Sequence, residues 1–182
     1  AGPMAHPVRP NTYLEISNFY TLTVYNKGAE VIRMLQTWLG ESVFQAGMQL
    51  YFKAYDGQAI TIDEFLHAMA QSSDQSMDQF KLWYTEQGTP MVHLETEYNA
   101  DLKQFVIIAK QSAPLSNPSM PAMLIPIRVG FLDQSGQALQ VKDAQGVLQS
   151  ETLLLLAQNQ QKLRDAESTI SSLRDELRQD KV

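Results

Sequence analysis

The spacing of apolar residues changes near residue 88, and this change limits the possible folds more than any other feature of the sequence. Upstream of it, apolar side chains recur at the period of an amphipathic helix. Downstream of it, from Val92 to Tyr98, apolar and polar residues alternate, which is typical of a strand with one buried face. Gly88 and Pro90 mark the change, because both residues commonly end a helix. The sequence therefore predicts an α+β chain in which helices precede antiparallel strands.

Residues 21–87 are predicted to form several helices. Thr61 and Glu64 have the spacing of a capping box, in which each of the two side chains binds the backbone amide of the other residue. Ser76 and Gln79 have the same spacing, and they predict a second capping box before the last helix of this half.

Residues 88–148 are predicted to begin an antiparallel β-sandwich that is incomplete, since the strands recognisable there are few for a full sandwich. Residues 149–182 are predicted to form an amphipathic helical tail. Aliphatic residues recur there at every seventh position, namely Leu156, Leu163, Ile170 and Leu177. Such a helix either docks on its own domain or pairs with another helix, so self-association through residues 150–182 is an open alternative.

The charge balance excludes several classes of partner. The chain has 14 Lys and Arg residues against 20 Asp and Glu residues, for a net charge of -6. Nucleic acids and anionic membranes both attract clustered basic residues, so neither is an expected partner. No apolar run approaches the ~20 residues of a bilayer span. No signal peptide is visible, which favours a cytoplasmic location and leaves the periplasm as the alternative.

No metal site is expected within this chain. It contains no cysteine, which excludes disulfides and thiolate ligands, and it contains no HExxH motif. His6, His67 and His93 are too scattered to suggest a metal site, so each is expected to have a structural role. Asp63 and Glu64 are adjacent carboxylates, but their place in the first turn of a helix is explained by capping and by the helix dipole.

Tyr25 lies in the segment that looks least generic, YNKGAEVIRML, at or near the start of a helix. Gly28 follows it and permits a close approach of the backbone. Taken from the residues alone, Tyr25 is a tyrosine that packs at a helix terminus. The segment also resembles the M1 family of zinc aminopeptidases, of the bacterial aminopeptidase N type. Further runs resemble this family in the same order, namely GPMAHPVRP, FQAGMQLYF, YDGQAITIDEF, WYTEQGTP and LIPIRVGFLD.

The resemblance implies an internal fragment of a larger enzyme. Residues 1–87 would be the C-terminal helical part of a thermolysin-like catalytic domain, and residues 88–148 the start of the β-sandwich domain that follows it. The zinc ligands of the family precede this segment, so zinc would be a cofactor of the parent enzyme with no ligand in this chain. The parent enzyme would release N-terminal amino acids from peptide substrates, and the isolated chain is expected to be inactive.

The resemblance also assigns roles to two tyrosines. Tyr25 corresponds to the catalytic tyrosine of the family, which donates a hydrogen bond to the oxyanion formed at the scissile carbonyl. A phenol suits this role because it keeps its proton at neutral pH. Tyr20 resembles a tyrosine that lines the substrate pocket of the family. Asn26 stands where many members have Glu, so no role in binding the substrate amine is assigned to it.

An alternative from another functional class is a non-catalytic interaction module that associates with itself through the helical tail. The interpretation of the chain as a fragment also makes a prediction about its surface. Helices of a fragment lack part of their normal packing partners, so an exposed apolar patch is expected. Its predicted members are Trp38, Phe44, Phe52 and Trp83.

Overall fold

The computed structural model describes residues 5–142 and 146–156. Its α-helices are α1 (Gly28–Leu39), α2 (Glu41–Tyr55), α3 (Ile62–Ser73) and α4 (Asp78–Thr85). A short 3-10 helix η1 (Ile16–Phe19) and a π-helical turn η2 (Thr23–Lys27) precede them. The strands are β1 (Met91–Asn99), β2 (Gln104–Ser112), β3 (Ile125–Leu132), β4 (Ala138–Leu139), β5 (Val141–Lys142), β6 (Leu148–Gln149) and β7 (Glu151–Leu156).

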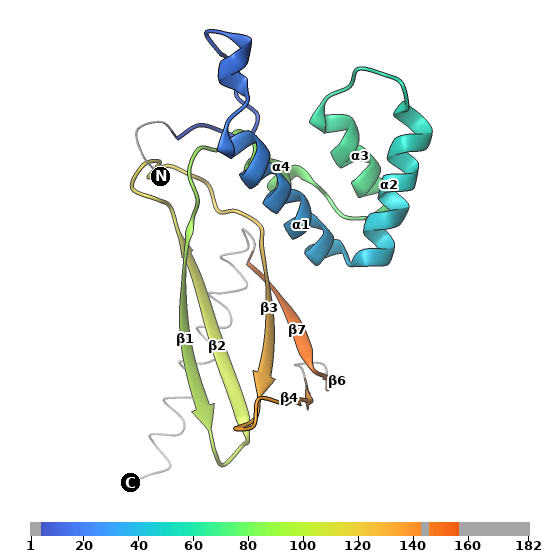
Figure 1. Ribbon diagram of the computed structural model, residues 1–182. Coiled ribbons are helices and arrows are strands. Elements are labelled where there is room, and N and C mark those ends of the chain that lie inside the picture. Colours follow the sequence, from blue (N-terminus) through green and yellow to red (C-terminus); the bar gives the residue numbers. More distant parts are fainter. Residues whose placement is uncertain (1–4, 143–145, 157–182) are drawn as a thin grey trace.

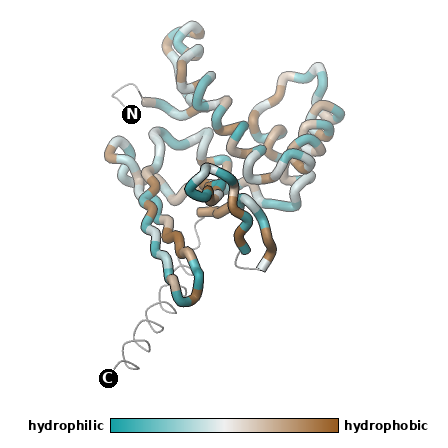
Figure 2. The backbone as a smooth tube through the Cα atoms, turned by 60° about the horizontal axis from the view of Figure 1, so that its bottom comes forward, coloured by the Kyte–Doolittle hydropathy of each residue, from teal (hydrophilic) through white to brown (hydrophobic). Residues whose placement is uncertain are grey.

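The predicted α+β class is confirmed, with the helices first and the strands second. The helices gather at one end of the molecule and the strands extend from the other (Figure 1). Hydrophobic stretches occur in both halves of the backbone (Figure 2). No helix among the described residues is long and apolar enough to cross a membrane.

The helical half packs around a core of buried apolar side chains. The side chains of Leu35, Met69 and Phe80 are each 0% exposed. The ring of Trp38 stacks on that of Phe80 with 5.8 Å between centroids, and so joins α1 to α4. Helices α2 and α3 approach closely at Gly47, where an added Cβ atom would lie 2.6 Å from the sulfur of Met69. Any larger residue at this position would force the Met69 and Ser72 side chains to shift, so glycine favours the close contact between the two helices.

The capping box predicted at the start of α3 is confirmed. The Thr61 hydroxyl accepts a hydrogen bond from the Asp63 amide at 3.2 Å, and the Glu64 carboxylate accepts one from the Thr61 amide at 2.8 Å. These bonds satisfy backbone N–H groups that have no partner within the helix.

Replacing this cap is expected to destabilise the chain measurably. Thr61→Ala should lower the free energy of unfolding by about 1 kcal/mol, because it removes the hydroxyl acceptor of the cap. Urea denaturation would measure the change as a lower midpoint with an unchanged m-value. Thr37→Ala is the matched control, since the exposed Thr37 hydroxyl only bonds back to the Arg33 carbonyl within α1. Equal losses in the two variants would contradict the capping role.

The second predicted capping box is wrong. The Ser76 hydroxyl donates to the Asp78 carboxylate at 2.8 Å and accepts from the Asp78 amide at 3.2 Å. The Gln79 side chain instead donates to the Ala122 carbonyl at 3.1 Å. A partly buried carbonyl that lost this donor would be left unsatisfied, which costs more free energy than leaving an exposed helix end to solvent. The tertiary contact therefore prevails over the local one.

Antiparallel pairs make up the β half. Strands β1 and β2 form a long hairpin from Met91↔Ser112 to Asn99↔Gln104, and β4, β3 and β7 form a second sheet in that order. Short strands β5 and β6 pair with each other. The rings of Phe105 and Phe131 meet edge to face with 5.0 Å between centroids, so the hairpin and the second sheet share a small apolar contact.

The prediction of a helical tail from residue 149 is wrong for residues 149–156. Strand β7 pairs antiparallel with β3, and Leu156 lies opposite Ile125. Exposure alternates along β7, with Thr152, Leu154 and Leu156 partly buried and the residues between them exposed. An apolar residue such as Leu156 fits both a helix with a seven-residue repeat and a strand with a two-residue repeat. Pairing with β3 makes this segment a strand. Residues 157–182, with the rest of the heptad seam, lie outside the described residues.

The loop between β2 and β3 packs into the helical core. Met123 is 1% exposed, and Met120 and Leu124 are buried with it. The indole N–H of Trp83 donates to the Leu124 carbonyl at 2.8 Å. The side-chain amide of Gln111 bonds to both the amide and the carbonyl of Met123, each at 2.8 Å. The β half therefore contributes side chains to the core of the helical half.

This packing corrects the expected exposed apolar patch. Phe44 and Trp83 are both 7% exposed, because the helices and the β2–β3 loop cover them. Trp38 is partly buried against the core. Phe52 is 55% exposed, as expected.

Candidate functional site

Tyr25 lies on the turn η2, which runs directly into α1. Its amide donates to the Thr21 carbonyl at 3.1 Å. The Thr21 hydroxyl accepts from the Val24 amide at 3.2 Å and also shares a hydrogen bond of 2.9 Å with the Nε2 atom of His6. Hydrogen bonds therefore hold the start of the turn together and also connect it to the N-terminal segment. Sequence reasoning gave His6 a structural role, and its contacts agree with one.

The two tyrosines singled out in the sequence lie against each other. The rings of Tyr20 and Tyr25 are stacked, with 6.2 Å between centroids and 21° between planes. The two residues are 61% and 59% exposed, respectively. Stacking limits how far each ring can turn, and the exposure leaves the phenol groups open to an incoming molecule. The pair can therefore present hydroxyl donors from a restrained position.

Tyr84 on α4 shows what a structural tyrosine of this chain looks like. It is 4% exposed, and burial raises the pKa of its phenol. Its hydroxyl is enclosed and has no hydrogen-bond partner among the described residues. Such a group cannot meet a substrate, whereas the exposed phenol of Tyr25 can.

Several large apolar side chains are exposed along the segment that carries the tyrosine pair. The segment of residues 13–25 projects beyond the helices at the N-terminal end (Figure 1). Its exposed large apolar residues besides the pair are Tyr13, Leu14, Ile16 and Leu22, at 57%, 97%, 58% and 78%. Large apolar side chains gathered in this way are typical of a surface that contacts another part of a protein.

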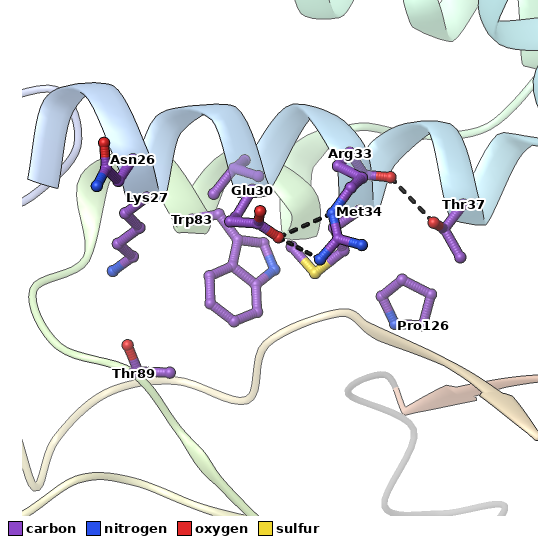
Figure 3. A pocket seen from close by; sticks show the side chains of 10 residues that line it. Asn26, Lys27, Glu30, Arg33, Met34, Thr37, Trp83, Thr89 and Pro126 are labelled. Carbon is purple, nitrogen blue, oxygen red and sulfur yellow. Dashed lines mark hydrogen bonds and ion pairs between the residues drawn. The ribbon is translucent and has the colours of Figure 1, made fainter.

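Lys27 makes tertiary contacts that were not predicted from the sequence. Its ammonium group donates to the Gly88 carbonyl at 2.6 Å and lies 5.9 Å from the centre of the Trp83 ring. Burial lowers the pKa of this amine. Figure 3 shows the side chain extending from the start of the helix toward the loop that carries Thr89. The only signal in the sequence was its place in the YNKGAEVIRML segment.

A shallow hollow beside Lys27 separates α1 from the strands. Its polar side chains largely satisfy one another, since the Arg33 guanidinium bonds to the Glu30 carboxylate at 2.9 Å and the Thr37 hydroxyl donates to the Arg33 carbonyl at 3.0 Å (Figure 3). The lining residues are Asn26, Lys27, Glu30, Val31, Arg33, Met34, Thr37, Trp83, Thr89 and Pro126. The hollow offers no convergent set of free polar groups of the kind that ligand sites use.

The described residues do not fit a zinc ion. They contain no group of three or more His, Cys, Asp or Glu side chains that could hold a metal. Asp63 is paired with Lys81 at 2.6 Å and with Arg9 at 3.4 Å, and the hydrogen bond from Lys81 is the main reason why the pKa of its carboxyl is lowered. His93 shares a 3.2 Å hydrogen bond with the Ser112 hydroxyl. Each candidate ligand of this kind is thus isolated from the others.

Comparison with known proteins places this geometry in a family. Residues 1–84 match the peptidase family M1 domain. Aminopeptidase N of Escherichia coli is 43% identical over 144 residues, which are 78% of this chain and 17% of that protein. Residues 1–84 of the chain belong to peptidase family M1. Aminopeptidase N of Caulobacter vibrioides is 51% identical over 100 residues, which are 55% of this chain and 12% of that protein.

These M1 relatives are much longer than the chain, which spans 17% and 12% of the two bacterial proteins. A solved structure, Legionella pneumophila aminopeptidase A in complex with aspartic acid, superposes with a TM-score of 0.67 at 28% identity, over 82% of this chain and 16% of that one. Residues 88–175 match a domain of unknown function (DUF3458) with an Ig-like fold. That match extends beyond residue 148, the predicted end of the β domain.

Proposed function

We propose that the whole protein is a zinc-dependent aminopeptidase that releases N-terminal amino acids from peptides, and that this chain supplies its oxyanion-stabilising tyrosine, Tyr25. The observation that carries the proposal is the exposed phenol of Tyr25, held on a restrained turn within the M1-matching segment. The names of the bacterial relatives, both aminopeptidase N, support the peptide substrate.

In this reaction the main task of the chain would be to place a hydrogen-bond donor next to the scissile carbonyl. Attack on a peptide carbonyl moves negative charge onto its oxygen, and a preorganised O–H donor stabilises that charge. The stacked ring of Tyr20 limits the movement of Tyr25, which keeps the donor aimed without reorganisation during the reaction. Tyr20, open to solvent next to it, would line the pocket for the first side chain of the substrate. Zinc would serve as the cofactor of the whole enzyme, and the described residues do not hold its ligands.

Substrate hydrolysis by the full-length protein tests this proposal. We expect it to release the arylamine from an aminoacyl arylamide, and to leave the N-acetylated form of the same substrate intact, because an aminopeptidase requires a free amino terminus. A chelator should abolish the activity and added zinc should restore it. Equal cleavage of both substrates would contradict an aminopeptidase.

The isolated 182-residue chain provides the second arm of the test. With added zinc and the same arylamide it should show no turnover above buffer, because donating a hydrogen bond to the oxyanion is only one part of the catalytic machinery. Turnover by the isolated chain that Tyr25→Phe abolishes would refute the view that this chain is only a part of the enzyme.

A further inference from the structure

We propose that Lys27 is a positioning residue, which holds the turn that carries Tyr25 against the linker between the two halves of the chain. This inference rests on the proposed role of Tyr25, but the contact that carries it stands on its own. The Lys27 ammonium and the Gly88 carbonyl are 2.6 Å apart and belong to residues that are 61 positions apart in the sequence.

The acceptor at Gly88 is itself fixed. Gly88 has a φ of +94°, which residues with a side chain rarely adopt, and an added Cβ would lie 3.0 Å from the Pro114 ring. The Asn117 side-chain amide donates to the Glu86 carboxylate at 3.1 Å and to the Gln87 carbonyl at 3.3 Å, directly before it. The linker therefore presents its carbonyl from a defined position, so a bond to it constrains Lys27.

The second neighbour of the ammonium is equally immobile. The Trp83 ring faces Lys27 at 5.9 Å, a distance at which a cation is attracted to an aromatic face. The indole N–H of Trp83 is bound to the Leu124 carbonyl at 2.8 Å in a buried position. Lys27 thus lies between an anchored ring and an anchored carbonyl, one from α4 and one from the linker.

Tyr25 depends on this anchor because of the kind of turn on which it lies. Both residues belong to η2, a π-helical turn in which the Gly28 amide donates to the Thr23 carbonyl five residues earlier. A π-helical turn is rare and less favourable than an α-helical one, so it persists where other contacts hold it. Without the Lys27 contact the turn can relax toward α-helical hydrogen bonding, which would redirect the Tyr25 phenol. A shift of about 1 Å in a catalytic group can cost on the order of 100-fold in rate.

The first test measures kinetics in the full-length enzyme. Lys27→Met should lower kcat by about 10- to 100-fold and change KM little, since the contact acts through an oxyanion donor rather than through substrate binding. Lys81→Met is the matched control, because that lysine pairs with Asp63 on the surface and should leave kcat unchanged. In a Tyr25→Phe background, Lys27→Met should cause no further loss of kcat. A full additional loss in that background would overturn the proposal.

The second test does not depend on activity. Hydrogen exchange in the full-length protein should be faster for the amides of residues 23–27 in Lys27→Met than in Lys81→Met. Unchanged exchange would overturn the positioning role of Lys27 even if Tyr25 is catalytic. If exchange becomes faster in Lys27→Met but Tyr25→Phe leaves kcat unchanged, the proposed function of Tyr25 is wrong and the positioning contact is not. Should Lys27→Met fail to fold, Gly88→Ala disturbs the same bond from the acceptor side and should give the same selective loss of kcat. A kcat that stays at the wild-type value in folded Gly88→Ala would count against the proposal.

Discussion

Tyr25→Phe in the full-length enzyme should lower kcat by about 100- to 1000-fold while KM stays near its original value. The change removes one O–H donor and leaves the ring, so the stack on Tyr20 persists. A preorganised oxyanion donor of this kind contributes about 3–4 kcal/mol to transition-state stabilisation. Steady-state kinetics on an aminoacyl arylamide would measure the loss.

The same experiment includes its own control for folding. Tyr13→Phe removes a hydroxyl from the same apolar segment, at 57% exposure, and should leave kcat unchanged. Thermal unfolding of both variants should coincide with that of the unmodified enzyme, since neither hydroxyl is buried. Comparable kcat values for Tyr25→Phe and the unmodified enzyme would remove Tyr25 from the reaction.

Phe80→Ala is expected to produce the largest loss of stability, about 3–5 kcal/mol in the free energy of unfolding. The Phe80 side chain is 0% exposed, and its ring contacts those of Trp38 and Tyr84 at 5.8 and 6.5 Å between centroids. Truncation would leave a cavity between α1 and α4 that this rigid core cannot fully close. A loss of this size is a large part of the 5–15 kcal/mol that stabilises a typical domain.

Denaturant unfolding of a variant at an exposed phenylalanine would separate the effect of burial from the effect of losing a phenyl ring. Phe52→Ala deletes an identical side chain that is 55% exposed, and it should cost no more than about 1 kcal/mol. If the two variants lost similar amounts, the assignment of Phe80 to the core would be wrong.

Local signals in the sequence predicted local structure well. The change of period near residue 88 gave the order of helices and strands, and the Thr61 and Glu64 spacing gave the cap of α3. The failures share one cause, which is a partner distant in the sequence. Gln79 binds a carbonyl 43 residues away, and the segment of β7 is a strand because β3 lies beside it. A single sequence carries no direct sign of either pairing.

The candidate site divides in the same way. Tyr20 and Tyr25 are close in the sequence, and their resemblance to a family motif made them candidates before any geometry was known. Lys27 belongs to the same motif, but its meaning depends on Gly88, Trp83 and the conformation of the linker. Sequence patterns identify residue types that suit a chemical task, whereas the groups that hold those residues in place come from tertiary contacts.

The burial of Met123 and Leu124 among the helices also bears on how the chain can be divided. The two family matches meet between residues 84 and 88, which suggests a convenient place to cut. A cut there would strip the helices of side chains that fill their interior and would leave the β2–β3 loop without its apolar seat. The boundary between the two families is thus not a boundary between autonomous folding units, and this chain should lose its structure in one cooperative step.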